Sequence, residues 1–166
     1  MRAEFRDLGY RLNATEPVMV HALNEIPTFE QPALLERVTT HQMAERVNKI
    51  ARSRQVLPEH IPRDGSLHTP IRQYVALIDD EIVGRVASIA AGKDTWVSNM
   101  YVAPEFRRRG IARSLLSQML LDDRLASVRQ SVLLATHTGA KLYPIVGYKE
   151  IGVLYIYTPP KAIPGK

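Results

Sequence analysis

Residues 99–121 read NMYVAPEFRRRGIARSLLSQMLL, and this stretch decides the fold. A β-like run over residues 96–102 ends at Pro104, and a turn rich in arginine leads from it to Gly110. Beyond Gly110, apolar residues recur with the spacing of one helical face. They are Ile111, Ala112, Leu115, Leu116, Met119 and Leu120. The pattern predicts a strand, a tight turn and an amphipathic helix over residues 109–125.

The start of this predicted helix lacks the usual capping residue. No Ser, Thr, Asp or Asn lies between Phe106 and Gly110 to accept hydrogen bonds from the first N–H groups. Arginines gather at the end of the helix where its dipole is already positive; they are Arg107, Arg108, Arg109 and Arg113. The arrangement therefore indicates an anion site, and a phosphate held by backbone N–H groups and arginine is the simplest occupant.

The composition is that of a soluble globular protein with one domain. The chain has 166 residues, of which 45% are hydrophobic and 23% charged, so it can build a core of ordinary size. Its formal charge of +5 favours anionic partners. Nucleic acid, a membrane surface and a phosphate-bearing cofactor all fit that charge.

Several kinds of site are excluded or disfavoured by the residues present. The chain has no cysteine, which excludes disulfides, thiol nucleophiles and cysteine metal sites. No His-Glu-x-x-His spacing occurs, so we expect no metal. The first ten residues are charged and no apolar run could span a bilayer, so we expect a cytoplasmic protein without a membrane partner.

The N-terminal part of the chain is harder to interpret. Residues 10–13 and 17–23 resemble short strands with Pro17 between them. Residues 39–54 have helical periodicity, with Thr39 and Gln42 at capping-box spacing, and we expect residues 32–38 to be helical too. Prolines and glycine punctuate residues 54–70, which predicts a long loop, and its length and proline content suggest a lid over residues 55–70.

The C-terminal part alternates between strands and helices. Residues 72–78 and 82–90 form a predicted hairpin, and a turn at residues 92–94 leads into the strand before the arginine turn. We expect a fully buried strand over residues 131–135, a short helix over 138–143 stopped by Pro144, and a last strand over 150–157. This order predicts an α/β domain with a mixed sheet over residues 1–158, followed by a flexible tail over 159–166.

Two segments resemble signatures of the GCN5-related N-acetyltransferase (GNAT) family. The family's acetyl-CoA signature, Gln/Arg-x-x-Gly-x-Gly/Ala, is matched by Arg107, Gly110 and Ala112. Its second signature, Leu-Tyr-x-x-x-Gly-Phe, is similar to Leu142-Tyr143-x-x-x-Gly147-Tyr148. The resemblance covers residues 72–150. It implies an α/β fold in which helices flank a mixed, largely antiparallel sheet that splays open.

The resemblance also implies a function. It predicts direct transfer of the acetyl group of acetyl-CoA to a primary amine of a small molecule, with Tyr143 as the general acid that protonates the departing thiolate. The residues that it assigns to cofactor binding are Met100, Tyr101, Val102, Arg107, Arg108, Arg109, Gly110, Ile111, Ala112, Arg113, Thr136 and Gly139. The small residues among them let the cofactor approach the backbone closely.

This sequence departs from the family at three positions. Thr136 stands where asparagine is common, and Gly139 replaces an alanine. Ser131 stands where relatives that acetylate protein N-termini often carry a glutamate base, which disfavours a protein acceptor. The general base therefore remains open among five side chains and a water chain; the side chains are His21, His60, His68, His137 and Glu105.

Two other functions compete with the enzyme. The departures at Ser131 and Thr136 keep open a non-catalytic module that binds acyl-CoA as a sensor or regulator. Nucleic-acid binding is disfavoured, because the arginines cluster at one helix start without interleaved aromatic residues. The family usually ends in two strands whereas this chain ends after one, so the N-terminal strands or a second subunit must cover a sheet edge, and a homodimer is possible.

Overall fold

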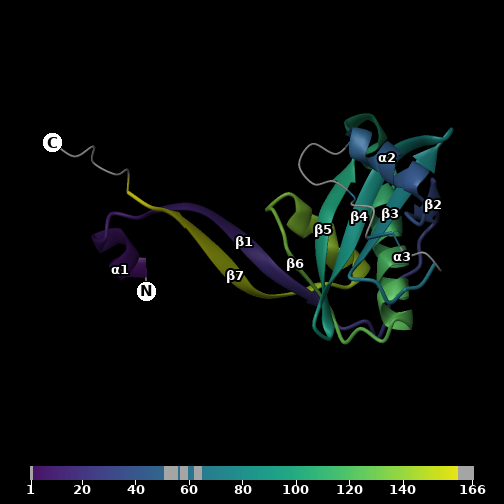
Figure 1. Ribbon diagram of the computed structural model, residues 1–166. Coiled ribbons are helices and arrows are strands. Elements are labelled where there is room, and N and C mark those ends of the chain that lie inside the picture. The colour runs from purple at the N-terminus through teal and green to yellow at the C-terminus, as the bar shows by residue number, and fades with distance from the viewer. Residues whose placement is uncertain (1, 51–55, 57–59, 62–64, 161–166) are drawn as a thin grey trace.

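A computed structural model describes residues 2–50, 56, 60–61 and 65–160 of the chain (Figure 1). Within them, strands join in one sheet in the order β2-β3-β4-β5-β6-β1-β7. The strands are β1 (Arg11–His21), β2 (Leu34–Arg37), β3 (Ile71–Ile78), β4 (Glu81–Ala91), β5 (Asp94–Val102), β6 (Ser131–Leu134) and β7 (Lys149–Thr158). The α-helices are α1 (Arg2–Asp7), α2 (His41–Ile50) and α3 (Ile111–Leu125), and short 3₁₀ helices are η2 (Pro104–Phe106), η3 (Gly139–Lys141) and η4 (Tyr143–Val146).

Helices cover both faces of this sheet. Gly84 of β4 faces α3, because a Cβ there would lie 3.1 Å from Leu115 and 3.2 Å from Ile111. Leu115 and Ile111 belong to the larger buried cluster of the protein. A second cluster joins Val47 of α2 to Val75 of β3, which points away from α3. The sheet is thus the middle layer of the fold.

The sheet splays open between β5 and β6. These two strands are parallel and pair only at Thr95 with Ser131 and Trp96 with Val132, after which β5 continues to Val102 without β6. Every other pairing in the sheet is antiparallel. This arrangement confirms the predicted fold class, a mixed and largely antiparallel splayed sheet flanked by helices.

A buried carboxylate fastens α3 to the sheet. Asp123 is fully buried and accepts hydrogen bonds from Arg72 of β3 at 2.5 Å, Ser88 of β4 at 2.7 Å and Thr95 of β5 at 2.8 Å. A buried charge is costly unless it is paired and hydrogen-bonded, and here the arginine and two hydroxyls meet that requirement. The network sets the position of α3 against three strands at once.

The N-terminal strand covers the sheet edge that the sequence left open. β1 pairs with β6 on one side and with β7 on the other. Figure 1 shows β1 and β7 continuing as a two-stranded ribbon away from the body of the sheet towards α1. The ribbon carries exposed apolar side chains. The homodimer stays a prediction, since β7 still forms the end of the sheet.

Two expectations for the N-terminal part were wrong. Residues 32–38 do not form a helix, because Leu34–Arg37 pairs as β2 with β3, and that pairing outweighs local helical preference. The two short strands expected around Pro17 are one strand, β1. Pro17 lies inside this strand, opposite Val153 of β7, and its carbonyl accepts a hydrogen bond from the N–H of Ala135.

Three local details also differ from expectation. Thr40 rather than Thr39 caps α2, since its Oγ1 accepts a hydrogen bond from the N–H of Met43. Residues 138–143 form no single helix, and Pro144 lies inside η4 instead of ending a helix. β6 alternates between buried and half-buried residues because only one of its faces meets the core. Much of the expected lid over residues 55–70, and residues 161–166 of the expected tail, lie outside the described residues.

We expect the stability of the protein to depend on pH through His21. This side chain is buried, and desolvation lowers its pKa from 6.5, an effect that the Val146 carbonyl and Asp123 only partly offset. The unfolded chain therefore takes up a proton near pH 6.5 while the folded chain resists it. The contribution of His21 to the free energy of unfolding is therefore fully present above that pH and is lost as the pH decreases.

Urea denaturation at about pH 8 and about pH 5 measures this effect. We expect His21→Gln, which stays neutral, to lose less stability than the wild type over that interval. His68→Gln, a change at an exposed histidine, is the control and should keep the wild-type difference. An unchanged pH dependence in His21→Gln would contradict the assignment.

Candidate functional site

The turn before α3 presents a row of unused backbone N–H groups. Within the described residues, none of the N–H groups of residues 108–113 donates to a backbone carbonyl, and the first bond of α3 runs from Ser114 to Gly110 at 3.1 Å. Gly110 is the N-cap and provides no side-chain cap. The helix therefore lacks a capping side chain, as the sequence predicts. The N–H groups of residues 108–113 are available to bind an anion.

Left-handed backbone conformations shape this turn. Arg108 has φ 61° and Gly110 has φ 90°, values that favour glycine. A Cβ on Gly110 would also lie 3.1 Å from Nε of Arg113. Successive residues of alternating handedness turn their N–H groups towards a common concave side, which is the geometry of an anion-binding nest.

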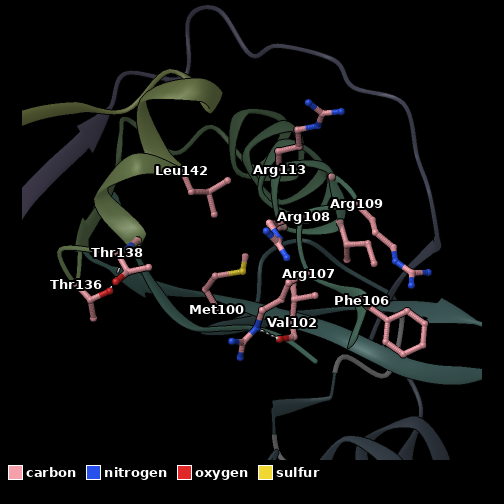
Figure 2. A pocket seen from close by; sticks show the side chains of 14 residues that line it. Met100, Val102, Phe106, Arg107, Arg108, Arg109, Arg113, Thr136, Thr138 and Leu142 are labelled. Atoms are coloured by element: carbon pink, nitrogen blue, oxygen red, sulfur yellow. Dashed lines mark hydrogen bonds between the residues drawn. The ribbon is translucent and has the colours of Figure 1, made fainter. Parts of the chain in front are cut away.

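The four arginines of the turn have different environments. Arg107 donates from Nε to the carbonyl of Val102 at 2.9 Å, which holds it against the end of β5 (Figure 2). The guanidinium of Arg109 lies over the ring of Phe106 and that of Arg113 over Phe29. Arg108 is exposed and makes no ion pair or hydrogen bond with the residues that the structure describes. Its charge is therefore available to a ligand.

A cavity of about 660 Å³ lies beside this turn, where β5 and β6 have separated. Its walls come from the end of β5, the arginine turn, the start of α3 and the segment that follows β6. Figure 2 shows Met100 and Leu142 pointing into the space from opposite sides. The lining residues are Met100, Val102, Phe106, Arg107, Arg108, Arg109, Gly110, Ile111, Ala112, Arg113, Thr136, Thr138, Gly139 and Leu142.

The structure brings together all the predicted cofactor residues except Tyr101. The side chain of Tyr101 points to the other face of the sheet, because it alternates along β5 with Met100 and Val102. Sequence reasoning missed Phe106, Thr138 and Leu142, which complete the wall. Two of them could have been found, since Phe106 lies within the first signature and Leu142 begins the second. That these residues bind a cofactor stays a prediction.

Tyr143 lies behind this wall. Its ring is within 3.3 Å of the Cβ position of Gly139, a lining residue, and its side chain is largely buried. Burial raises the pKa of Tyr143, so the phenol holds its proton at neutral pH. No described residue makes a hydrogen bond to its hydroxyl, which leaves that proton available for transfer.

Two positions that differ from the family have structural roles. Ser131 is fully buried and shares a hydrogen bond of 2.8 Å with the hydroxyl of Tyr148. Oγ1 of Thr136 accepts a hydrogen bond from the N–H of Gly139 at 3.1 Å and so orders the start of η3. Neither contact supplies a base.

None of the five side chains considered as a general base lines the cavity. His21 is buried in the core, and Glu105 and His68 are exposed elsewhere. His137 is exposed beside the cavity and its Nε2 lies 3.2 Å from Oγ1 of Thr15. The base therefore stays unassigned.

Among the described residues, no group of three or more His, Cys, Asp or Glu side chains is placed to hold a metal ion. No helix in that part of the chain has the length and apolar character needed to cross a membrane.

Comparison with known proteins gives a family match over the segment that contains strands β3 to β6 and helix α3. Residues 70–150 match the model of the acetyltransferase (GNAT) domain. Comparison of the sequence with curated proteins finds no match.

Solved structures extend the likeness to nearly the whole chain. A GCN5-related N-acetyltransferase from Kribbella flavida is 14% identical with a TM-score of 0.74, over 98% of this chain and 64% of that one. One from Sphaerobacter thermophilus is 20% identical with a TM-score of 0.71, over 94% and 54%. A GCN5-related N-acetyltransferase-like protein from Streptococcus suis is 16% identical with a TM-score of 0.68, over 95% and 66%. The chain thus spans only 54–66% of their length, and the likeness establishes the fold.

The anion site can be tested with inorganic pyrophosphate alone. We expect it to bind the wild type, and we expect Arg108→Glu to weaken binding by about tenfold or more, because the variant replaces an available cation with an anion. Arg124→Glu, at the exposed last turn of α3, carries the same charge change and should bind as the wild type does. Isothermal titration calorimetry measures both, and equal weakening by the two variants would mean that only net charge matters.

Proposed function

Because residues 70–150 belong to the acetyltransferase (GNAT) domain family, we propose that this protein is an N-acetyltransferase that moves the acetyl group of acetyl-CoA directly to a primary amine of a small molecule. The observation that carries the proposal is the row of unused N–H groups at residues 108–113 beside a cavity at the split of the sheet. An acetyltransferase needs such an anion site, since its cosubstrate carries a diphosphate.

The chemistry of the cavity fits acetyl-CoA. The N–H groups of the turn and the guanidinium of Arg108 would hold the diphosphate, because they combine a helix N-terminus with a positive charge. The pantetheine arm is uncharged and elongated, and the apolar side chains of Met100, Val102 and Leu142 give it a matching wall. Bound there, acetyl-CoA supplies an activated thioester.

The separation of β5 from β6 gives this thioester an accessible position. Beyond Trp96 no described strand pairs with the β6 side of β5, so the backbone groups of that edge remain available for hydrogen bonds. An acceptor that approaches this edge can form a C–N bond to the acetyl carbon while the C–S bond breaks. No covalent enzyme intermediate is needed.

Tyr143 supplies the proton for the departing thiolate in this proposal. Its phenol is protonated at neutral pH, and its ring lies against Gly139 at the wall of the cavity. The amine gives up a proton to a base that stays unassigned, since no described histidine or carboxylate lines the cavity. Positioned proton transfer of this kind contributes about a hundred- to ten-thousand-fold in rate.

The proposed activity can be tested with purified protein, acetyl-CoA and a panel of primary amines. Calorimetry reports acetyl-CoA binding, and release of free CoA thiol reports transfer. We expect acetyl-CoA to bind and thiol to appear with at least one amine. Tight binding without thiol release across the panel would favour a sensor, and no binding at all would overturn the proposal.

We expect Tyr143→Phe to lower kcat by about a hundred- to ten-thousand-fold without changing the KM for acetyl-CoA. The change removes only a hydroxyl that bonds to no described residue, so the melting temperature should stay the same. Tyr157→Phe, near the end of β7 and not among the residues that line the cavity, is the matched control. Full kcat in Tyr143→Phe would remove this residue from the mechanism.

A further inference from the structure

Arg85 of β4 is a buried cation that forms no ion pair with any residue that the structure describes. The residue is only 9% exposed, and its buried Nε has no hydrogen-bond partner. Among the residues that the structure describes, every other buried polar or charged side chain makes a hydrogen bond. These side chains are His21, Arg72, Ser88, Thr95, Ser114, Ser117, Asp123 and Ser131.

The other buried arginine makes the contrast clear. Arg72 is paired with Asp123 at 2.5 Å, whereas no described carboxylate reaches Arg85. Desolvation lowers the pKa of Arg85, and its electrostatic interaction with Tyr101 offsets this effect only in part. Burying an unpaired charge is unfavourable, and such a group often marks a place where a ligand provides the missing charge.

Arg85 lies on the face of the sheet opposite α3. Its neighbour Gly84 faces α3, so Arg85 points to the other side. It forms a row across the strands with Val75 of β3 and Tyr101 of β5. Tyr101 is 38% exposed, so this end of the row is open to solvent.

The row adjoins the split in the sheet from the side away from the cavity. Met100 and Val102 line the cavity, and Tyr101 between them points towards the face that carries Arg85. β4 and β5 lie one strand spacing apart, about 5 Å. A molecule that rests on Arg85 and Tyr101 can therefore reach the open edge of β5 without entering the cavity itself.

We propose that Arg85 binds an anionic group of the acceptor, so that the acceptor is an amine that also carries a carboxylate or a phosphate. The inference rests on the proposed acetyltransferase activity and names the acceptor class for the same site. The planar guanidinium can hold two oxygens of either anion, and the Tyr101 hydroxyl can donate a further hydrogen bond. The amine then faces the edge of β5.

Paired acceptors that differ only in the anion provide the test. Each of a series of L-amino acids is compared with its carboxamide, and O-phosphoethanolamine with ethanolamine, by thiol release at saturating acetyl-CoA. We expect the anionic member of one pair to have the higher kcat/KM. Which pair responds distinguishes a carboxylate from a phosphate.

The variant Arg85→Met removes the charge while keeping an unbranched side chain. It should raise KM for the anionic acceptor by about 10- to 100-fold, the effect of losing charge-assisted hydrogen bonds. The ratio of kcat/KM between the anionic acceptor and its uncharged partner should fall by the same factor. Because an unpaired buried charge is removed, its melting temperature without ligand should equal or exceed that of the wild type.

Two further variants keep the test decisive. Arg85→Lys keeps the charge without the planar fork, so it should retain part of the preference even if Arg85→Met folds poorly. Arg124→Met, at an exposed site on α3, is the matched control and should behave as the wild type.

The outcomes separate this inference from the activity on which it rests. Absence of thiol release with every amine overturns the proposed function. Thiol release with equal preference for charged and uncharged partners overturns the role of Arg85 alone, and so does a preference that persists in Arg85→Met. A preference lost in Arg85→Met and partly kept in Arg85→Lys supports it.

Discussion

The divergence of β5 from β6 is the constraint on which the rest of this structure depends. The strands share only a short parallel contact at Thr95 and Trp96, and the cavity exists because β5 then continues alone. Two contacts hold α3 beside this opening. Near its C-terminal end, Asp123 accepts hydrogen bonds from β3, β4 and β5, and near its N-terminal end Ile111 and Leu115 pack against Gly84 of β4.

The two faces of β5 present different chemical environments. On the α3 face, Met100 and Val102 help to line a cavity next to unused N–H groups, an environment suited to a long molecule with a charged end. On the other face, Tyr101 lies opposite Arg85, which pairs with no carboxylate in the described part of the chain. Because one edge of β5 is unpaired beyond Trp96 in the described sheet, molecules bound on either face can reach the same backbone groups.

The N-terminal strand β1 connects two strands of the C-terminal half. It lies between β6 and β7, which belong to the same sheet but do not pair with each other. It also carries His21, which packs edge-on against Tyr148. The second signature therefore depends on a strand more than a hundred residues away. No local pattern in residues 10–23 indicates that contact.

The sequence by itself determined the strand, turn and helix around Gly110, because missing caps, prolines and helical periodicity are local properties of the chain. The family resemblance also pointed to most residues of the cavity wall, although not to Phe106, Thr138 and Leu142. Only the tertiary structure decided that Leu34–Arg37 is a strand, that Pro17 lies within one, and that Arg85 is buried with no described carboxylate to pair with it. These features depend on which distant segments pair, and pairing is a property of the assembled sheet.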